Sequence, residues 1–424
     1  MQLPRRKLLL SIALLPVWLV LGELAARVVL AARGKPYDSA EVESYLLDVR
    51  SSVVDRIPGM DDRERVMAGQ DTALLFPHPF AGWEMLGPQQ ERELAGFRSG
   101  RFDKSYEVLV IGGSVSSLTA RFGAKAMQQV LQADPRLEGR EVVVLNHGRG
   151  SFKQPQMTLK AAYLLGLGMR PDAIVLIDGF NEVALGYDNA TLGAHPVFPH
   201  WQKYGPMIEQ LGLDAERVRV AARAVEARDR IAAETERSLE YGLHHSAILG
   251  SLVHRRVRSA KQAWIGFQDA LVRPPTGTDR ERFERGGAFP EEADAVMDLI
   301  ARSWVESSVQ LAALCDLYGV TFLHVLQPTL HDEGAKVATP EELQSGTAKE
   351  SWIEGVRSGY PRLRLASSVL RERGVPFLDA TDTFAEVEET VYYDACHFRG
   401  KGMELFAKRV ARSLLEQLPA PGSR

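Results

Sequence analysis

The sequence predicts an α/β fold built on a parallel sheet, with a helical insertion and an N-terminal membrane segment. Short apolar runs without charges alternate with longer segments of helical periodicity, which is the pattern of parallel strands joined by helices. One long stretch lacks strand-like runs, and the chain starts with basic residues followed by apolar ones. With 424 residues, 45% of them hydrophobic, the chain is long enough for about two or three domains.

Residues 1–34 are expected to form an anchor. The basic residues Arg5–Lys7 precede the uncharged run Leu8–Gly22, an order that favours a cytoplasmic N-terminus. The run is shorter than the roughly 20 residues that span a bilayer, but Glu23 and Arg27 behind it can snorkel toward an interface. We therefore expect a single-pass inner-membrane protein whose remaining chain is periplasmic. The alternative is a cleaved signal peptide, although no convincing cleavage site is visible.

Five apolar runs are expected to be buried strands, because each is short and ends at residues typical of turns. They are Val108–Ile111, Val142–Leu145, Ala173–Ile177, Val320–Leu326 and Val375–Leu378. Segments of helical character separate or follow them: Ala120–Ala133, Pro155–Leu167, Glu291–Leu317, a helix running to Arg373, and Gly402–Leu418. Alternation of this kind predicts a parallel sheet covered by helices.

The expected domain boundaries follow from these patterns. Residues 35–105 are interpreted as a stalk leading to a domain edge, and 187–290 as a helical insertion rich in Ala, Arg and Glu. The α/β domain then has two parts, 106–186 and 291–418, followed by a tail, 419–424.

Ligands of open α/β sheets bind at the carboxyl ends of the strands, so the residues just after each apolar run are the candidates for chemistry. Four segments stand out: Gly112-Gly113-Ser114 after the first strand, Asn146–Gly150 after the second, Asp178–Glu182 after the third, and Asp394–His397 before the last helix. We expect them to meet at one edge of the sheet.

These segments contain the parts of a nucleophilic site. A serine hydroxyl such as that of Ser114 is a weak nucleophile until a base accepts its proton, and the imidazole of His397 is suited to that near neutral pH. Asp394 can fix the tautomer of the ring and stabilise the imidazolium. The Asn181 amide, with the backbone N–H groups of Ser114 and Gly150, can surround a developing oxyanion.

Taken together, the four segments resemble the blocks of the SGNH, or GDSL, hydrolase superfamily, in the family's order. The resemblance implies a flavodoxin-like three-layer α/β/α sandwich, the catalytic triad Ser114, Asp394 and His397, and an oxyanion hole of Ser114, Gly150 and Asn181. Two features depart from the pattern: Gly113 stands where many members have Asp, and Gly148 fits the second block as well as Gly150 does.

The resemblance also implies a function. Three features resemble those of membrane-anchored bacterial members associated with cell-surface polysaccharides. They are the anchor, the sequence Gly-Phe-Asn-Glu of the third block, and Gln327-Pro328 after a strand. The expected activity is hydrolysis of an acyl ester, in particular an O-acetyl ester of an envelope carbohydrate. Two alternatives stay open: an O-acetyltransferase with the same triad, and a non-catalytic glycan-binding or scaffold protein on a decayed hydrolase fold. The insertion is also suited to docking an envelope protein.

No cofactor or metal is expected. No Gly-Lys-Ser/Thr and no Gly-x-Gly-x-x-Gly follows the first strand, which argues against nucleotide binding. His244 and His245 lack acidic or Cys partners at ligand spacing, and His147 and His324, next to strands, are interpreted as hydrogen-bonded core histidines. The net charge of −4 gives no attraction to nucleic acid. Cys315 and Cys396 either pair or remain free thiols.

Overall fold

The computed structural model describes residues 5–33, 36–50, 75–78, 80–85, 88–204, 215–272 and 289–418, with side chains in the first helix from Val17 onward. The chain divides into two compact units: Met1–Leu75 with Gly205–Val272, and Phe76–Tyr204 with Arg273–Arg424. The expected tail, 419–424, lies outside the described residues.

The larger unit contains a five-stranded parallel sheet. Its strands are β3 (Ser105–Gly112), β4 (Glu141–Asn146), β5 (Ala173–Asp178), β6 (Thr321–Leu326) and β7 (Phe377–Asp379), in the spatial order β4-β3-β5-β6-β7. This is the doubly wound order in which the first strand has the second on one side and the third on the other. All positions of β3 and β5 are buried, as expected for strands covered on both faces. The predicted parallel sheet is confirmed.

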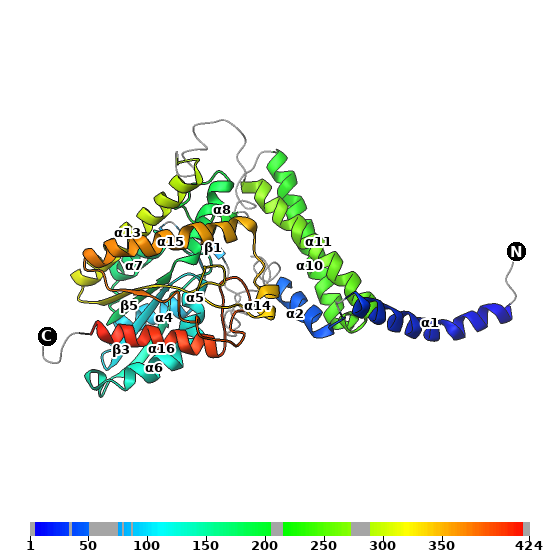
Figure 1. Cartoon of the computed structure of the whole chain (residues 1–424), viewed down its shortest axis with the longest axis horizontal. Helices are drawn as coiled ribbons and strands as arrows, with labels where there is room; N and C mark the ends of the chain where they lie inside the picture. The colour runs from blue at the N-terminus through cyan, green and yellow to red at the C-terminus, as the bar shows by residue number, and fades with distance from the viewer. Residues whose placement is uncertain are drawn as a thin grey trace. The chain divides into compact units, whose positions relative to one another are not determined.

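Helices cover both faces of this sheet (Figure 1). One layer consists of α6 (Ala124–Gln132) and α16 (Lys401–Glu416), whose apolar faces pack on alternate strand residues such as Val108 and Val110. The opposite layer consists of α7 (Gln156–Gly166), α13 (Ala293–Leu317) and α15 (Glu350–Glu372). The unit is therefore a three-layer α/β/α sandwich.

Shorter elements complete the larger unit. They are the two-stranded sheet β1 (Leu75–His78) and β2 (Gly82–Met85), then α4 (Pro88–Arg98), α5 (Ser114–Leu118), η2 (Thr119–Gly123), η3 (Pro135–Leu137), η4 (Asn181–Leu185), α8 (Gly186–Thr191), η5 (Trp201–Tyr204) and α14 (Pro340–Ser345). The helix expected from Ala120 begins at Ser114 instead, because α5, η2 and α6 follow one another directly. Residues 187–204, expected in the insertion, belong to the sheet unit.

The smaller unit is helical in its described residues. It contains α1 (Arg5–Ala32), α2 (Ser39–Val49), α10 (Ala215–Glu240), η6 (Leu243–His245) and α11 (Ala247–Val272). The hairpin of α10 and α11 buries Ile231 and Val257 against Leu46 of α2. The expected stalk is therefore not one segment, because α2 packs on the insertion whereas β1, β2 and α4 belong to the sheet unit.

The expected transmembrane span coincides with the first part of α1. Within the described residues, no helix is both long enough and apolar enough to cross a bilayer. The run Leu8–Gly22 begins before Val17, where the side chains lie outside those that the structure describes.

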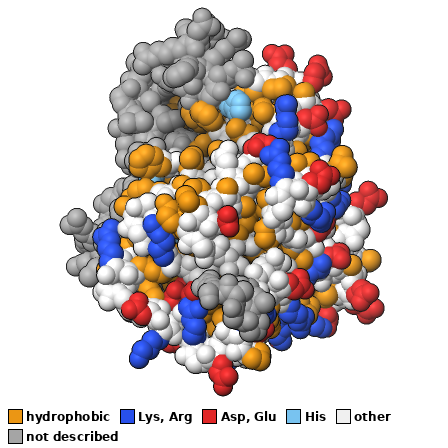
Figure 2. Space-filling view, turned by 90° about the vertical axis from the view of Figure 1, so that its left-hand side faces the viewer, with side chains coloured by type: hydrophobic (Ala, Val, Ile, Leu, Met, Phe, Trp, Pro, Cys, Tyr) orange, Lys and Arg blue, Asp and Glu red, His pale blue; other side chains and the backbone are white. Residues whose placement is uncertain are grey.

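One face of the structure, seen in Figure 2, carries acidic and basic side chains next to one another along its right-hand side. Among the residues drawn in colour, neither sign of charge dominates this face. Such a surface offers no broad basic field for a polyanion.

Candidate active site

The serine turn connects β3 to α5 and depends on two glycines. A Cβ on Gly112, whose φ is 146°, would lie 2.0 Å from the carbonyl oxygen of Ile177 on β5. A Cβ on Gly113 would lie 2.4 Å from the amide nitrogen of Asn181. The chain therefore passes closely over β5 before Ser114 begins α5. The half-buried serine lies beyond the end of β3, where the strand order reverses and α/β sheets bind their ligands.

The other two predicted triad residues lie on the loop before α16. Ser114 Oγ is 2.6 Å from His397 Nε2, and His397 Nδ1 is 2.6 Å from Asp394 Oδ2. The second carboxylate oxygen of Asp394 accepts hydrogen bonds from the backbone N–H groups of Cys396 (2.9 Å) and His397 (2.7 Å). The structure thus brings the hydroxyl, the imidazole and the carboxylate into one hydrogen-bonded chain.

The surroundings of His397 favour its charged form. Burial opposes the imidazolium, but the neighbouring Cys396 sulfur and the Asp394 carboxylate more than offset this, so the pKa of His397 is well above its usual value. Burial also opposes the ionised form of Asp394, yet its hydrogen bonds with His397 hold the pKa of this carboxyl below its usual value. Tyr393 stacks on the imidazole, with ring centroids 5.7 Å apart. The arrangement stabilises the cation that forms when a histidine takes a proton from serine.

A buried glutamate fixes the loop that carries the histidine. Glu342 of α14 is fully buried, and one of its oxygens accepts the backbone N–H groups of Val391 (2.8 Å) and Tyr392 (2.9 Å). Its other oxygen forms an ion pair with Lys336 at 2.9 Å. Just beyond, Tyr392 and Phe398 form an antiparallel bridge on either side of the segment that holds Asp394 and His397. Single-sequence patterns give no sign of this role.

The three predicted oxyanion donors lie in different segments: Ser114 begins α5, Asn181 begins η4, and Gly150 lies in the loop after β4. Asn181 Nδ2 donates to the carbonyl of Phe152 at 2.7 Å, which uses one of the two hydrogens of the amide. Of the two candidate glycines, Gly148 packs under α5, since a Cβ there would lie 2.3 Å from Ser116 Oγ, whereas the space beside Gly150 is open. No hydrogen bond joins Gly150 to the triad in the described part of the chain, so its role stays a prediction.

Glu182, which ends the third candidate segment, is a buried acid to which the sequence assigned no role of its own. Glu182 accepts the backbone N–H of Gly179 at 2.7 Å and that of Gln154 at 2.9 Å, so it ties the loop before α7 to the turn that carries Asn181. Burial, with Asp178 nearby, raises the pKa of Glu182 to about 8. Burial lowers the pKa of Lys153 to about 7. The available signal was an acidic residue directly after Gly-x-Asn.

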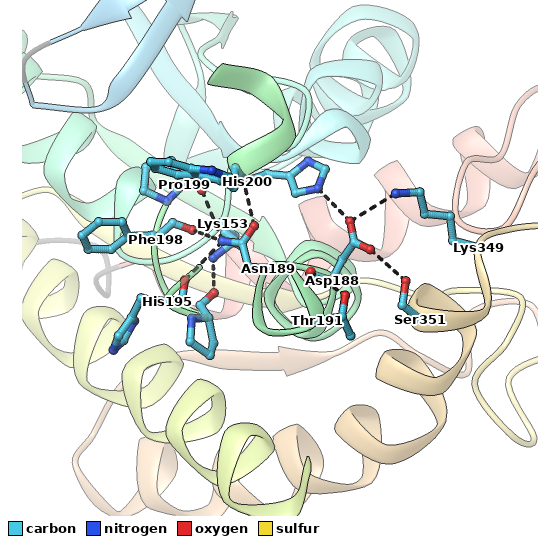
Figure 3. Close-up of polar contacts among 12 residues, drawn as sticks. Lys153, Asp188, Asn189, Thr191, His195, Phe198, Pro199, His200, Lys349 and Ser351 are labelled. Atoms are coloured by element: carbon cyan, nitrogen blue, oxygen red, sulfur yellow. Dashed lines mark hydrogen bonds and ion pairs between the residues drawn. The ribbon is translucent and has the colours of Figure 1, made fainter. Parts of the chain in front are cut away.

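A second network holds the chain beyond Asn181 (Figure 3). Asp188 accepts hydrogen bonds from Ser351 at 2.8 Å and His200 at 3.2 Å, and Lys349 lies 3.5 Å away. The next side chain, Asn189, contacts the carbonyls of His195, Phe198 and Pro199 and the N–H of Trp201. Together, the two residues fasten α8, the segment after it and the start of α15.

The surroundings of this network shift the pKa values of its ionisable groups, and the network lies next to the third block, which contains Asn181. Burial lowers the pKa of His200 to about 4. Burial opposes the Asp188 carboxylate, but the hydrogen bond from His200 and the charge of Lys349 hold its pKa below the usual value. Trp352, at the start of α15, packs edge-on against Phe180, with centroids 6.2 Å apart. Because Phe180 directly precedes Asn181, the network braces the backbone of the predicted oxyanion donor.

The histidines expected in the core are there. His147 bonds Glu93 at 2.7 Å, and His324 bonds Asp178 at 2.8 Å and Ser308 at 2.7 Å, with both rings buried. That prediction is confirmed.

The two cysteines do not pair, because Cys315 and Cys396 are both buried free thiols. Atoms of Asp394, Cys396 and His397 that could ligate a metal lie within 4.8 Å of one another. However, two of these three residues, Asp394 and His397, are joined by a 2.6 Å hydrogen bond. This is the arrangement of a catalytic triad rather than of a metal site.

Comparison with known proteins finds similarity among solved structures. No family model matches the chain, and no curated protein does. A GDSL-like lipase from Bacteroides thetaiotaomicron is 8% identical with a TM-score of 0.38, over 78% of this chain and 98% of that one. A catalytic mutant of an acetylxylan esterase from Geobacillus stearothermophilus is 11% identical with a TM-score of 0.34, over 73% and 94%. At such low identities and scores, the geometry of the site itself has to carry the functional conclusion.

Proposed function

We propose that the chain is a serine esterase of the SGNH type, with Ser114 as nucleophile, His397 as general base and Asp394 as the acid that orients it. The observation that carries the proposal is the continuous chain from hydroxyl to imidazole to carboxylate, with both contacts at 2.6 Å. This is the arrangement that activates a serine for attack on a carbonyl.

In the proposed reaction, Ser114 Oγ attacks the ester carbonyl while His397 Nε2 takes its proton. Asp394 keeps the other ring nitrogen protonated, so that Nε2 faces the serine. Collapse of the tetrahedral intermediate breaks the bond to the alkoxy group, and His397 returns the proton to the leaving alcohol. Water then attacks the acyl-serine ester by the same route and releases the carboxylic acid and the free serine.

The oxyanion of the intermediate is proposed to lie at the start of α5. The backbone N–H of Ser114, the remaining amide hydrogen of Asn181 and the N–H of Gly150 are its proposed donors. Each such donor contributes roughly 10²- to 10³-fold in rate. The close contact between Gly113 and Asn181 supports the proposal, since it sets the amide directly beside the serine turn.

We propose an O-acetyl ester of a cell-envelope carbohydrate as the substrate, with the chain held at the membrane by its N-terminal segment and the sheet unit in the periplasm. The support is the resemblance of the sequence blocks and the apolar run behind Arg5–Lys7. Acetate released from acetylated envelope glycan identifies hydrolysis, whereas acetylated sugar acceptor identifies the transferase alternative.

A serine-reactive fluorophosphonate tests the nucleophile. The wild-type chain is expected to be labelled and to hydrolyse p-nitrophenyl acetate, whereas Ser114→Ala loses both properties. Ser117→Ala is the matched control, because this serine lies in the same turn and bonds Asn146 rather than the histidine. Equal labelling of Ser114→Ala and wild type would refute the assignment, and a wild type that neither labels nor turns over ester would favour the scaffold alternative.

A further inference from the structure

The two charges that interrupt the apolar N-terminal helix are used at a joint with the helical hairpin. Glu23 on α1 accepts hydrogen bonds from the hydroxyl of Ser246 at 2.8 Å and the backbone N–H of Ala247 at 2.6 Å. These groups form the N-terminus of α11, where a carboxylate is stabilised by unpaired N–H groups and the helix dipole. Glu23 thus caps a helix more than two hundred residues away in the sequence.

Arg27 completes the joint. Its guanidinium contacts Glu23 at 2.9 Å and donates to the carbonyl of His245 at 2.8 Å. It also lies over the ring of Tyr37, whose hydroxyl donates to His244. The sequence suggested that both charges reach toward an interface. The structure instead bonds them to the closed end of the α10–α11 hairpin, which fixes that end against α1.

Apolar side chains are exposed on both sides of this joint. On α1, the five consecutive residues from Val17 to Leu21 are 50% to 68% exposed. Consecutive residues point around the whole helix, so their exposure is not confined to one stripe. On α11, Ile248, Leu249 and Leu252 are 42% to 45% exposed, and Ile248 lies against Gly22 of α1. The apolar surface therefore continues from one helix onto the other.

We infer that the closed end of the α10–α11 hairpin docks on the surface of an anionic lipid bilayer, beside the point where α1 enters it. A groove on a protein covers one stripe of a helix, whereas lipid surrounds it. Because the exposed apolar residues of α1 point in all directions, lipid is the partner that can cover them all. The inference rests on the membrane attachment proposed above, and adds that the insertion itself contacts lipid.

A basic band supports an anionic lipid as the occupant. Arg255, Arg256 and Arg258 follow Leu252 within two turns of α11, and all three are exposed. Arg256 also lies 3.6 Å from Glu234 of α10. Seven residues of helix rise about 10 Å, comparable to the depth of about 5–10 Å to which interfacial helices bury their apolar face. With Ile248 at the acyl boundary, the arginines lie at the level of the lipid phosphates.

The test places the environment-sensitive fluorophore NBD on single cysteines of the full chain in vesicles of phosphatidylcholine and phosphatidylglycerol. Leu252→Cys probes the hairpin end, and Leu21→Cys probes the entry of α1. Ser259→Cys is the matched control, because it is exposed on the same helix about 10 Å further from the joint. The native thiols are buried, and the unsubstituted chain gives the labelling blank.

NBD at positions 252 and 21 is expected to shift to the blue and to be quenched by spin-labelled lipid, whereas NBD at 259 is not. Arg255→Glu with Arg258→Glu should lower the quenching at 252 about twofold or more, since each basic residue near an anionic surface adds attraction. Water-like emission at 252 overturns the inference, whether or not position 21 is embedded. Hydrolysis of p-nitrophenyl acetate, measured on the same samples, reports separately on the proposed esterase function.

Discussion

A methyl group added at Gly113 should disable the proposed oxyanion hole without disturbing the triad. In Gly113→Ala, the new Cβ would start 2.4 Å from Asn181 Nδ2, and ordinary contact begins at 3.4 Å. The amide therefore has to move by about 1 Å, a misplacement that can cost roughly 10²-fold in rate. At 1.36 kcal/mol per factor of ten, this corresponds to about 2.7 kcal/mol of transition-state stabilisation.

The assay is steady-state hydrolysis of p-nitrophenyl acetate, with folding followed by circular dichroism. We expect kcat to fall about 100-fold with KM nearly unchanged, because the donor acts on the transition state rather than on the bound ester. Gly150→Ala is the matched control. Its Cβ meets nothing within 4 Å, its φ is not positive, and the substitution keeps the backbone N–H.

A folded Gly113→Ala enzyme with wild-type kcat would refute this reasoning. Should the substitution unfold the chain, Asn181→Ala provides the second measurement, since it removes the same donor without a clash. Its kcat should also fall by about 10²- to 10³-fold. Full activity in that variant would exclude Asn181 from the oxyanion hole.

Three further predictions concern the groups around the triad. Asp394→Asn removes a carboxylate that raises the pKa of His397. Because the base has to be neutral, the activity of the wild type should rise with pH through the pKa of His397. In the variant, this rise should move to lower pH and kcat should fall. A pH–rate profile that does not move would contradict the role of Asp394 beside His397. Glu182→Gln turns one acceptor oxygen into a donor facing a backbone N–H. In this variant kcat should fall about tenfold, while KM and phosphonate labelling stay as in the wild type. If substrate binding and labelling weaken together with kcat, the role of Glu182 is purely structural. Asp188→Ala leaves a buried histidine and a lysine without their shared carboxylate. The free energy of unfolding, measured in urea, should fall by about 1–3 kcal/mol, the cost of leaving buried donors without an acceptor, and an unchanged free energy of unfolding would show that the network carries little stability.

The sequence was informative where a single local pattern decides the outcome. Uncharged apolar runs between turn residues can only be buried strands or short core helices, and their alternation with helices selected the parallel sheet. Ser114, Asn181 and His397 were found because chemistry gathers where strands and their following loops end. The structure places all three at one end of the sheet unit, although 283 positions separate the serine from the histidine.

The sequence was uninformative where the partner of a side chain decides its role. No sequence pattern marks Glu182, Glu342 or Lys153 as buried, and only the folded chain shows their burial and the backbone groups that they bind. For the same reason, amphipathic periodicity predicted the helices of the insertion but not that α2 and α1 pack against them. A periodic pattern identifies a buried face without identifying what covers it.

The glutamate behind the histidine loop has a consequence for the proposed active site. The proposed nucleophile follows a strand of the sheet, whereas the loop of the proposed base depends on α14 through Glu342 and its contacts with Val391 and Tyr392. Damage around α14 would reach the proposed base before the proposed nucleophile, because Glu342 holds the backbone of the histidine loop whereas Ser114 follows β3 directly. The proposed nucleophile and the proposed base therefore depend on different parts of the fold.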